Sequence, residues 1–183
     1  GTLFASQQAH LPPDLICLSK GLTGGFLPMG ITVISSPMFE AFDSNEPART
    51  FWHGHSYTAN PLACVAALAS LDLLLSKESR DARKNLAATF TDWAARLSRH
   101  PAVENPRHQG CIFAFEVLST RGGYLSPIRD RLEKAFLDRG VLIRPLGNTV
   151  YVLPPYAIKK NELHQIWHAI EDILDSILPD QRE

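Results

Sequence analysis

The chain has 183 residues, of which 45% are hydrophobic and 20% are charged, and its formal net charge is -1. This composition is that of an ordinary globular protein with a buried core. A charge balance so close to neutral argues against nucleic acid or an anionic membrane as the partner. Small, roughly neutral ligands are therefore favoured.

Cysteine usage and hydropathy indicate the compartment. Cys17, Cys64 and Cys111 lie far apart in apolar surroundings, without Cys-x-x-Cys spacing. We interpret them as reduced core residues of a cytoplasmic protein. The longest apolar run, residues 61–75, contains Asp72 and is short for a membrane span, so it predicts a buried helix. No secretory signal is visible at the first residues.

The first part of the chain predicts two strands and a helix. Leu15 to Leu18 indicates a short buried strand, and residues 30–34 indicate a second, β-branched strand after a glycine-rich loop. Asn60 followed by Pro61 is typical of a helix start. The helix that follows is apolar nearly all round, which suits close packing on a sheet.

The end of this helix near Ser76 is the expected boundary between residues 1–76 and residues 77–183. The second part predicts helix, strand, helix, two strands and helix, which is a compact α/β unit. The first expected element is a helix that ends at His100-Pro101 and on which Ala82, Leu86, Phe90, Trp93 and Leu97 recur at steps of three and four. The next are a strand at 111–117, a helix capped by Ser126-Pro127 and closed by Gly140, and strands at 141–144 and 150–153 around a Gly147-Asn148 turn. The last is a helix with Leu163, Ile166, Trp167, Ile170, Ile173, Leu174 and Ile177 on one face.

Lys20 ends the first predicted strand and is followed at once by a glycine-rich loop. A P-loop would place its glycines before the lysine and a Ser or Thr directly after it, so that motif is excluded. An amine beside a flexible backbone suits Schiff-base chemistry with a carbonyl compound. A lysine that merely surfaces at a strand end is the alternative.

The segment from His53 to Pro61 is the second candidate. The hydroxyl of Ser56, the backbone amides beside Gly54 and the nearby helix start predict an anion-binding cradle. A tight turn before the helix is the alternative explanation of the same residues.

Two further candidates lie in the second part. Arg144 precedes Pro145, where its guanidinium could clamp a carboxylate in bidentate geometry, although arginines at strand ends are usually solvated. His164 and His168 lie one helical turn apart but lack the glutamate of a zincin motif. We expect them on a solvated face and expect no metal site.

Two segments together resemble the class III pyridoxal-phosphate aminotransferases. Residues 19–25 (SKGLTGG) are similar to the cofactor-lysine segment, and residues 51–63 (FWHGHSYTANPLA) to the phosphate-site segment. Residues 143–156 (IRPLGNTVYVLPPY) most resemble members that serve biotin biosynthesis. Those members transfer the amino group of S-adenosylmethionine to 8-amino-7-oxononanoate.

The resemblance covers essentially the whole chain and aligns it with the later half of those enzymes. It implies an α/β fold, the C-terminal part of a fold-type I transferase. Residues 1–76 would be the end of the large cofactor-binding domain and residues 77–183 the small domain. The family's aspartate for the pyridine nitrogen, its glycine-rich phosphate loop and its ring-stacking aromatic would all precede Gly1.

The resemblance also implies site residues. Lys20 would bind pyridoxal phosphate covalently and then move the proton between substrate and cofactor. His55 and Ser56 would bind the cofactor phosphate of the neighbouring subunit in a homodimer; the family usually has threonine where Ser56 stands. The substrate-binding residues implied are Gly54 from the same segment, Arg144, which would hold the carboxylate of the keto substrate, and Tyr151 beside it.

Two alternatives stay open. One is another class III transaminase, acting on an ω-amino acid such as ornithine or 4-aminobutyrate. The other is a catalytically inert α/β piece that pairs with another polypeptide through apolar surfaces.

Overall fold

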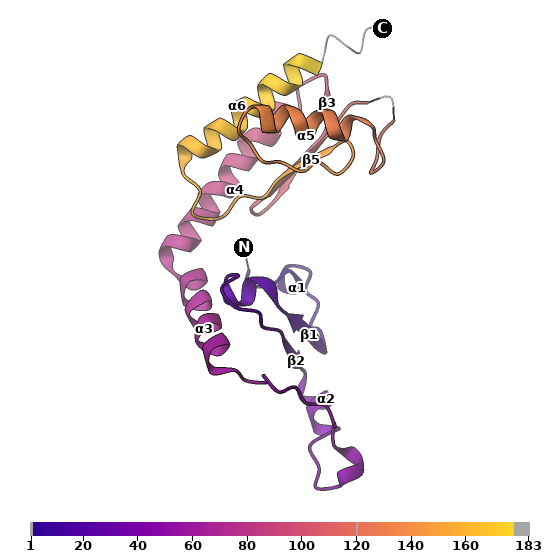
Figure 1. Cartoon of the computed structure of the whole chain (residues 1–183), viewed down its shortest axis with the longest axis vertical. Helices are drawn as coiled ribbons and strands as arrows, with labels where there is room; N and C mark the ends of the chain where they lie inside the picture. The colour runs from indigo at the N-terminus through magenta and orange to yellow at the C-terminus, as the bar shows by residue number, and fades with distance from the viewer. Residues whose placement is uncertain (1, 120, 178–183) are drawn as a thin grey trace. The chain divides into compact units, whose positions relative to one another are not determined.

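A computed structural model describes residues 2–119 and 121–177 (Figure 1). The chain divides into two compact units, Gly1–Lys77 and Glu78–Glu183. The boundary expected at residue 76 lies one residue before this division. The assignment of the two parts to a large and a small domain stays a prediction.

The first unit is built around an antiparallel pair of short strands, in which Leu15 lies opposite Ile34 and Leu18 opposite Ile31. Both expected strands are thus confirmed. Its elements are α1 (Ala5–Gln8), β1 (Leu15–Leu18), the 3₁₀ turn η1 (Lys20–Thr23), β2 (Ile31–Ile34), α2 (Ser36–Glu40), the 3₁₀ turn η2 (Pro47–Arg49) and α3 (Pro61–Leu75).

The expected burial of β1 and α3 is wrong for this chain. Leu15 is 51% exposed, and α3 buries only Ala63. Apolar composition predicts that a helix face will be covered, but the main neighbour of α3 among the described elements is the short turn η1. The exposed side chains of α3 include Leu62, Val65, Leu68 and Leu73, each between 64% and 72% exposed.

The three cysteines are free, as expected. Their expected place in the core is wrong for Cys17, which is exposed on β1, whereas Cys64 and Cys111 are half-buried. Among the described residues, no helix combines the length and the apolarity that crossing a bilayer requires.

The N-terminus of α3 is capped as the sequence predicts. The side-chain oxygen of Asn60 accepts hydrogen bonds from the backbone N–H groups of Leu62, at 3.0 Å, and Ala63, at 3.2 Å. Pro61 occupies the first helical position, where no N–H is needed. These bonds satisfy two of the four N–H groups that a helix start leaves without partners.

We expect Asn60→Ala to lower the free energy of unfolding of the first unit by about 1 kcal/mol, because both capping bonds are lost. Asn60→Asp keeps the acceptor and should change stability by only a few tenths of a kcal/mol. Urea unfolding followed by circular dichroism measures both. Equal midpoints for Asn60→Ala and the parent chain would contradict the capping role.

The second unit is a three-stranded antiparallel sheet, in the order β3-β4-β5, with helices packed against it. The α/β unit expected for this part is confirmed. Its elements are α4 (Lys77–Leu97), β3 (Val103–Gln109), β4 (Ile112–Val117), α5 (Ile128–Asp138), β5 (Thr149–Val152) and α6 (Lys160–Ile177).

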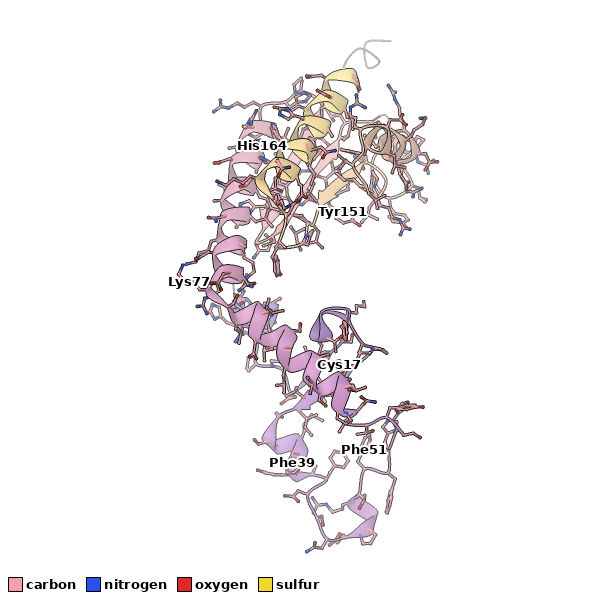
Figure 2. The ribbon with its side chains drawn as sticks, turned by 60° about the vertical axis from the view of Figure 1, so that its left-hand side comes forward. Cys17, Phe39, Phe51, Lys77, Tyr151 and His164 are labelled. Carbon is pink, nitrogen blue, oxygen red and sulfur yellow. The ribbon has the colours of Figure 1, made fainter. Side chains whose placement is uncertain are left out.

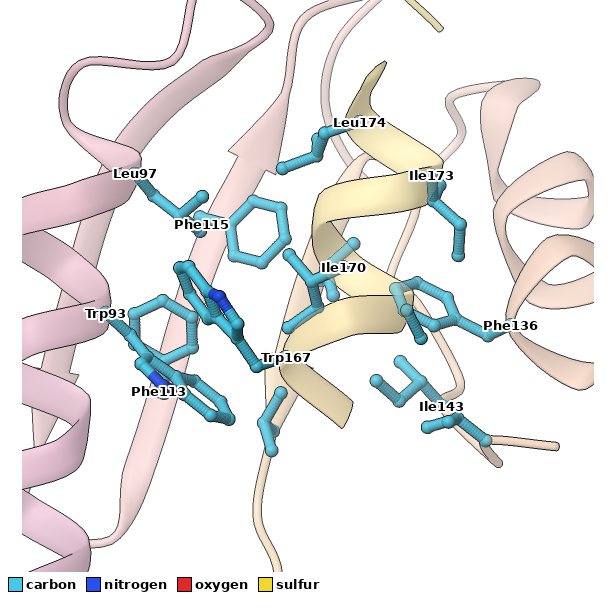
Figure 3. Close-up of a cluster of buried hydrophobic side chains, with 14 of the residues drawn as sticks. Trp93, Leu97, Phe113, Phe115, Phe136, Ile143, Trp167, Ile170, Ile173 and Leu174 are labelled. Carbon is cyan, nitrogen blue, oxygen red and sulfur yellow. The ribbon is translucent and has the colours of Figure 1, made fainter. Parts of the chain in front are cut away.

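The core of the second unit lies between the sheet and the helices α4, α5 and α6, and aromatic rings cluster at its centre among aliphatic side chains (Figure 3). The ring of Trp93 on α4 lies 5.6 Å from Phe113 on β4 and 5.0 Å from Trp167 on α6. Phe90, which is fully buried, contacts both Trp93 and Phe113. The stripes predicted for α4 and α6 therefore supply much of this core, and the side chain of Ile177, expected in the second stripe, lies outside the described residues.

Two strand assignments differ from the expectation. The sequence did not predict β3, because Asn105 and Pro106 interrupt it; Asn105 has a φ of +48°, and the register shifts between Glu104 and Arg107. Such a bulge weakens the alternating pattern that marks a strand. The strand expected at 141–144 is wrong, because the backbone of these residues pairs with no strand in the described part of the chain. Their side chains do alternate in burial, which explains the strand-like sequence pattern.

The expected capping role of Ser126 is also wrong. The hydroxyl of Ser126 pairs with the hydroxyl of Ser119 at 3.1 Å, and the N-cap of α5 is Pro127, which makes no side-chain capping bond. Ser126 is therefore a residue of the preceding loop, in which it is buried.

Candidate active site

Lys20 lies directly after β1, as the first residue of η1, and is exposed. Its φ is +53°, in the left-handed region that costs a residue with a side chain about 1–2 kcal/mol. Within the described part of the chain, its ammonium group has no hydrogen bond or ion pair. Strained backbone of this kind concentrates at functional sites, and the amine is free to react.

The glycine-rich loop after Lys20 is held by α3. The hydroxyl of Ser70 on α3 donates to the carbonyl of Gly21 at 3.3 Å. Gly24 has a φ of +63°, which favours glycine, and a Cβ added there would be in ordinary van der Waals contact with the Ser70 hydroxyl, at 3.4 Å. Thr23 is buried in the same turn. No local sequence pattern marks Ser70 as part of this site, because 49 residues separate it from its partner Gly21.

The segment before α3 forms a turn that leaves hydrogen-bond donors unused. The ring nitrogen Nδ1 of His55 accepts from the N–H of Tyr57 at 3.1 Å, and the His55 carbonyl accepts from the N–H of Thr58 at 3.0 Å. The backbone N–H of Gly54 and the hydroxyl of Ser56 have no partner among the residues that the structure describes. These exposed donors are available to an anion.

The first unit contains a pocket of about 890 Å³, and only some of these candidate residues line it. His55 lines it, together with the residues that lead into β2 and the start of α3. Lys20, Gly54 and Ser56 do not line it. The structure thus places the two predicted segments in one unit without bringing Lys20 into the pocket beside His55.

Arg144 and Tyr151, both in the second unit, line one pocket. Tyr151 is half-buried on β5, opposite Ala114 on β4 (Figure 2). Arg144 is exposed and also lines a second pocket, of about 470 Å³. The described residues offer its guanidinium no ion pair or hydrogen bond.

The second pocket contains another arginine whose charge is already matched. Arg129 bonds to Asp130 at 2.8 Å and to Glu133 at 2.9 Å. Arg144 is thus the cation of this pocket that lacks a carboxylate partner in the described part of the chain. Such a guanidinium is suited to bind a carboxylate from a ligand.

The remaining candidates are not brought into a site. His164 and His168 are exposed on α6, as expected, and their ring centroids are 6.5 Å apart. Figure 2 labels His164 on this helix. A search of the described residues finds no group of three side chains placed to hold a metal ion. Cys111 is no rival nucleophile, because burial raises the pKa of its thiol and so lowers the thiolate fraction at neutral pH.

The model of one protein family, described as aminotransferase class-III, matches residues 1–174. Adenosylmethionine-8-amino-7-oxononanoate aminotransferase from Synechococcus elongatus is 51% identical over 177 residues, which cover 97% of this chain and 41% of that protein. The Helicobacter pylori protein of the same name is 35% identical over 182 residues, with the same coverage.

A solved structure supports the fold. The amine transaminase from an uncultivated Pseudomonas species, in a PLP-bound form, aligns with a TM-score of 0.78 at 28% identity, over 93% of this chain and 40% of its own. The expected fold, that of part of a fold-type I transferase, is confirmed. The chain spans 41% of the length of each of the two curated relatives named above.

Proposed function

This chain belongs to the class III aminotransferases, and from that membership we propose that it carries the reactive lysine and a substrate carboxylate site of a transaminase of biotin biosynthesis. The intact enzyme would transfer the amino group of S-adenosylmethionine to 8-amino-7-oxononanoate and so produce 7,8-diaminononanoate. One observation carries this proposal: Lys20 presents an unpaired, exposed amine from a strained backbone position at a strand end.

Pyridoxal phosphate fits the donors that this chain offers. Its aldehyde would react with a primary amine, which Lys20 offers, and the phosphate of a second subunit's cofactor would bind hydrogen-bond donors, which the hydroxyl of Ser56 and the N–H groups of Gly54 and His55 offer. When bound, this cofactor supplies the electron sink for the substrate. Lys20 would then move the proton between the substrate carbon and the cofactor carbon.

We place residues 54–56 against the cofactor phosphate of a second subunit in a homodimer. Lys20 does not line the pocket beside His55, which is the arrangement expected if the two segments serve different cofactors. Arg144 would bind the carboxylate of the keto substrate, and Tyr151, which lines the same pocket, would contact that substrate. The three free cysteines suit a reducing compartment, and we propose the cytoplasm.

The test is to incubate the chain with pyridoxal phosphate, reduce with borohydride, and locate the modified lysine by peptide mass spectrometry. One cofactor per chain on Lys20 is the expected result. Modification scattered over the surface lysines, or none, would mean that this chain does not bind the cofactor without other parts of the enzyme. The exposed apolar residues of α3 favour this second candidate, a chain that must pair with further polypeptide.

The amino donor is a separate question. Ornithine and 4-aminobutyrate are the donors expected of the rival ω-amino acid transaminases. Turnover of the intact enzyme with S-adenosylmethionine and not with those donors would support the biotin assignment. Turnover with ornithine or 4-aminobutyrate alone would replace it.

A further inference from the structure

We propose that Asn148 is a positioning residue for the carboxylate site: it holds the loop Gly122–Ser126 against the turn that follows Arg144. This inference rests on the proposed role of Arg144 in binding the keto substrate, and it adds the part of the fold that shapes one of the two pockets that Arg144 lines, the one without Tyr151.

Asn148 is buried, with only 6% of its surface exposed, and it bonds to two separate segments. Its amide nitrogen donates to the carbonyl of Val117 at 2.9 Å, and its amide oxygen accepts from the N–H of Gly123 at 2.8 Å. The N–H of Val117 donates in turn to the backbone carbonyl of Asn148 at 2.8 Å. The amide nitrogen of Asn148 therefore binds the end of β4, and its amide oxygen binds the loop that follows.

The preceding residue packs on the same loop. Gly147 has a φ of +64°, and a Cβ added there would overlap the carbonyl of Gly123 and the backbone of Tyr124. Only a residue without a side chain allows the two backbones to approach this closely. The loop is thus seated directly on the Gly147-Asn148 pair.

The loop held in this way forms one wall of the pocket of about 470 Å³. Tyr124 and Leu125 line it from the loop, and Arg144, Pro145 and Leu146 line it from the turn. The loop is also closed on itself, because the N–H of Ser126 donates to the Gly123 carbonyl at 3.0 Å. Loss of the bond between Asn148 and the Gly123 N–H should therefore displace Tyr124 and Leu125, which line the same pocket as the unpaired guanidinium of Arg144.

The experiment uses the intact holoenzyme with 8-amino-7-oxononanoate and with its primary amide, which lacks the carboxylate. We expect Asn148→Ala to raise KM for the acid at least tenfold, to change kcat less than about twofold, and to leave KM for the amide unchanged. A matched control is Ile173→Ala, which removes a buried side chain of α6 that lines neither pocket. It should leave both KM values unchanged.

Two further variants test how Asn148 acts. Gly147→Ala keeps both side-chain bonds of Asn148 but pushes on Gly123, and it should produce the same selective rise in KM. In an Arg144→Ala background, Asn148→Ala should have less than a twofold effect. Equal rises in KM for acid and amide, or a full effect without Arg144, would overturn the inference.

A measurement on the unmodified enzyme decides the case if the variants do not fold. We expect the Gly123 amide to be protected from hydrogen exchange, and the acid, not the amide, to slow exchange at Tyr124 and Leu125. Unchanged exchange in the presence of saturating acid would overturn the inference. If the unmodified enzyme turned over no keto acceptor, the proposed function itself would fail.

Discussion

Replacing Lys20 with alanine should lower the transamination rate of the intact enzyme by about 10⁴-fold or more. The amine both attaches the cofactor and transfers the proton, and general acid–base catalysis alone contributes up to about 10⁴-fold. Single-turnover kinetics with S-adenosylmethionine measure the loss. A small primary amine added to the solution should restore part of the rate to Lys20→Ala, because it can take over the proton transfer.

The backbone of Lys20 supplies an independent readout. At a φ of +53°, glycine is less strained than any residue with a Cβ, so Lys20→Gly should be more stable to unfolding than Lys20→Ala by about 1 kcal/mol. Both variants should be equally inactive. Lys160→Ala, which removes an exposed lysine at the start of α6, is the control and should keep full activity. An active Lys20→Gly enzyme would remove Lys20 from the mechanism.

Local signals in the sequence predicted much of the fold. The Asn60-Pro61 pair marks the start of α3, and the apolar stripe from Leu86 to Leu97 marks the buried face of α4. Long-range effects account for the errors. At 141–144 the side chains alternate in burial, but no neighbouring strand among the described residues bonds to this backbone. In β3 the bulge near Asn105 interrupts the alternating pattern by which a strand is recognised. Periodicity reports which side chains are buried, whereas strand pairing depends on distant backbone.

The candidate site divides in the same way. The position of Lys20 before a glycine-rich loop and of Arg144 before a proline can be recognised from the sequence. The left-handed conformation of Lys20 and the bonds of Asn148 cannot. The partners of Asn148 lie 25 and 31 residues away, and the sequence around it predicts only a turn. Chemistry-bearing residues are therefore easier to predict than the residues that hold them in place.

Arg144→Ala should lower kcat/KM for 8-amino-7-oxononanoate by roughly 10²-fold or more. Hydrogen bonds to charged groups contribute about 1.5–3 kcal/mol each, and a guanidinium can make two to one carboxylate. Among the described residues, no carboxylate pairs with Arg144, so its guanidinium is free to bind the substrate and its removal should cost the full interaction. Steady-state kinetics at saturating donor measure it.

The shape of the cation should matter as well as its charge. Arg144→Lys keeps the positive charge but loses the planar fork, so it should recover only part of kcat/KM for the acid. Neither variant should affect the primary amide of the substrate, which has no charge to pair. Arg99→Ala, at an exposed arginine outside both pockets, is the control and should behave as the unmodified enzyme does. If Arg144→Ala weakened the acid and the amide equally, Arg144 would support the pocket without binding the carboxylate, and the acid would have to be held by another cation.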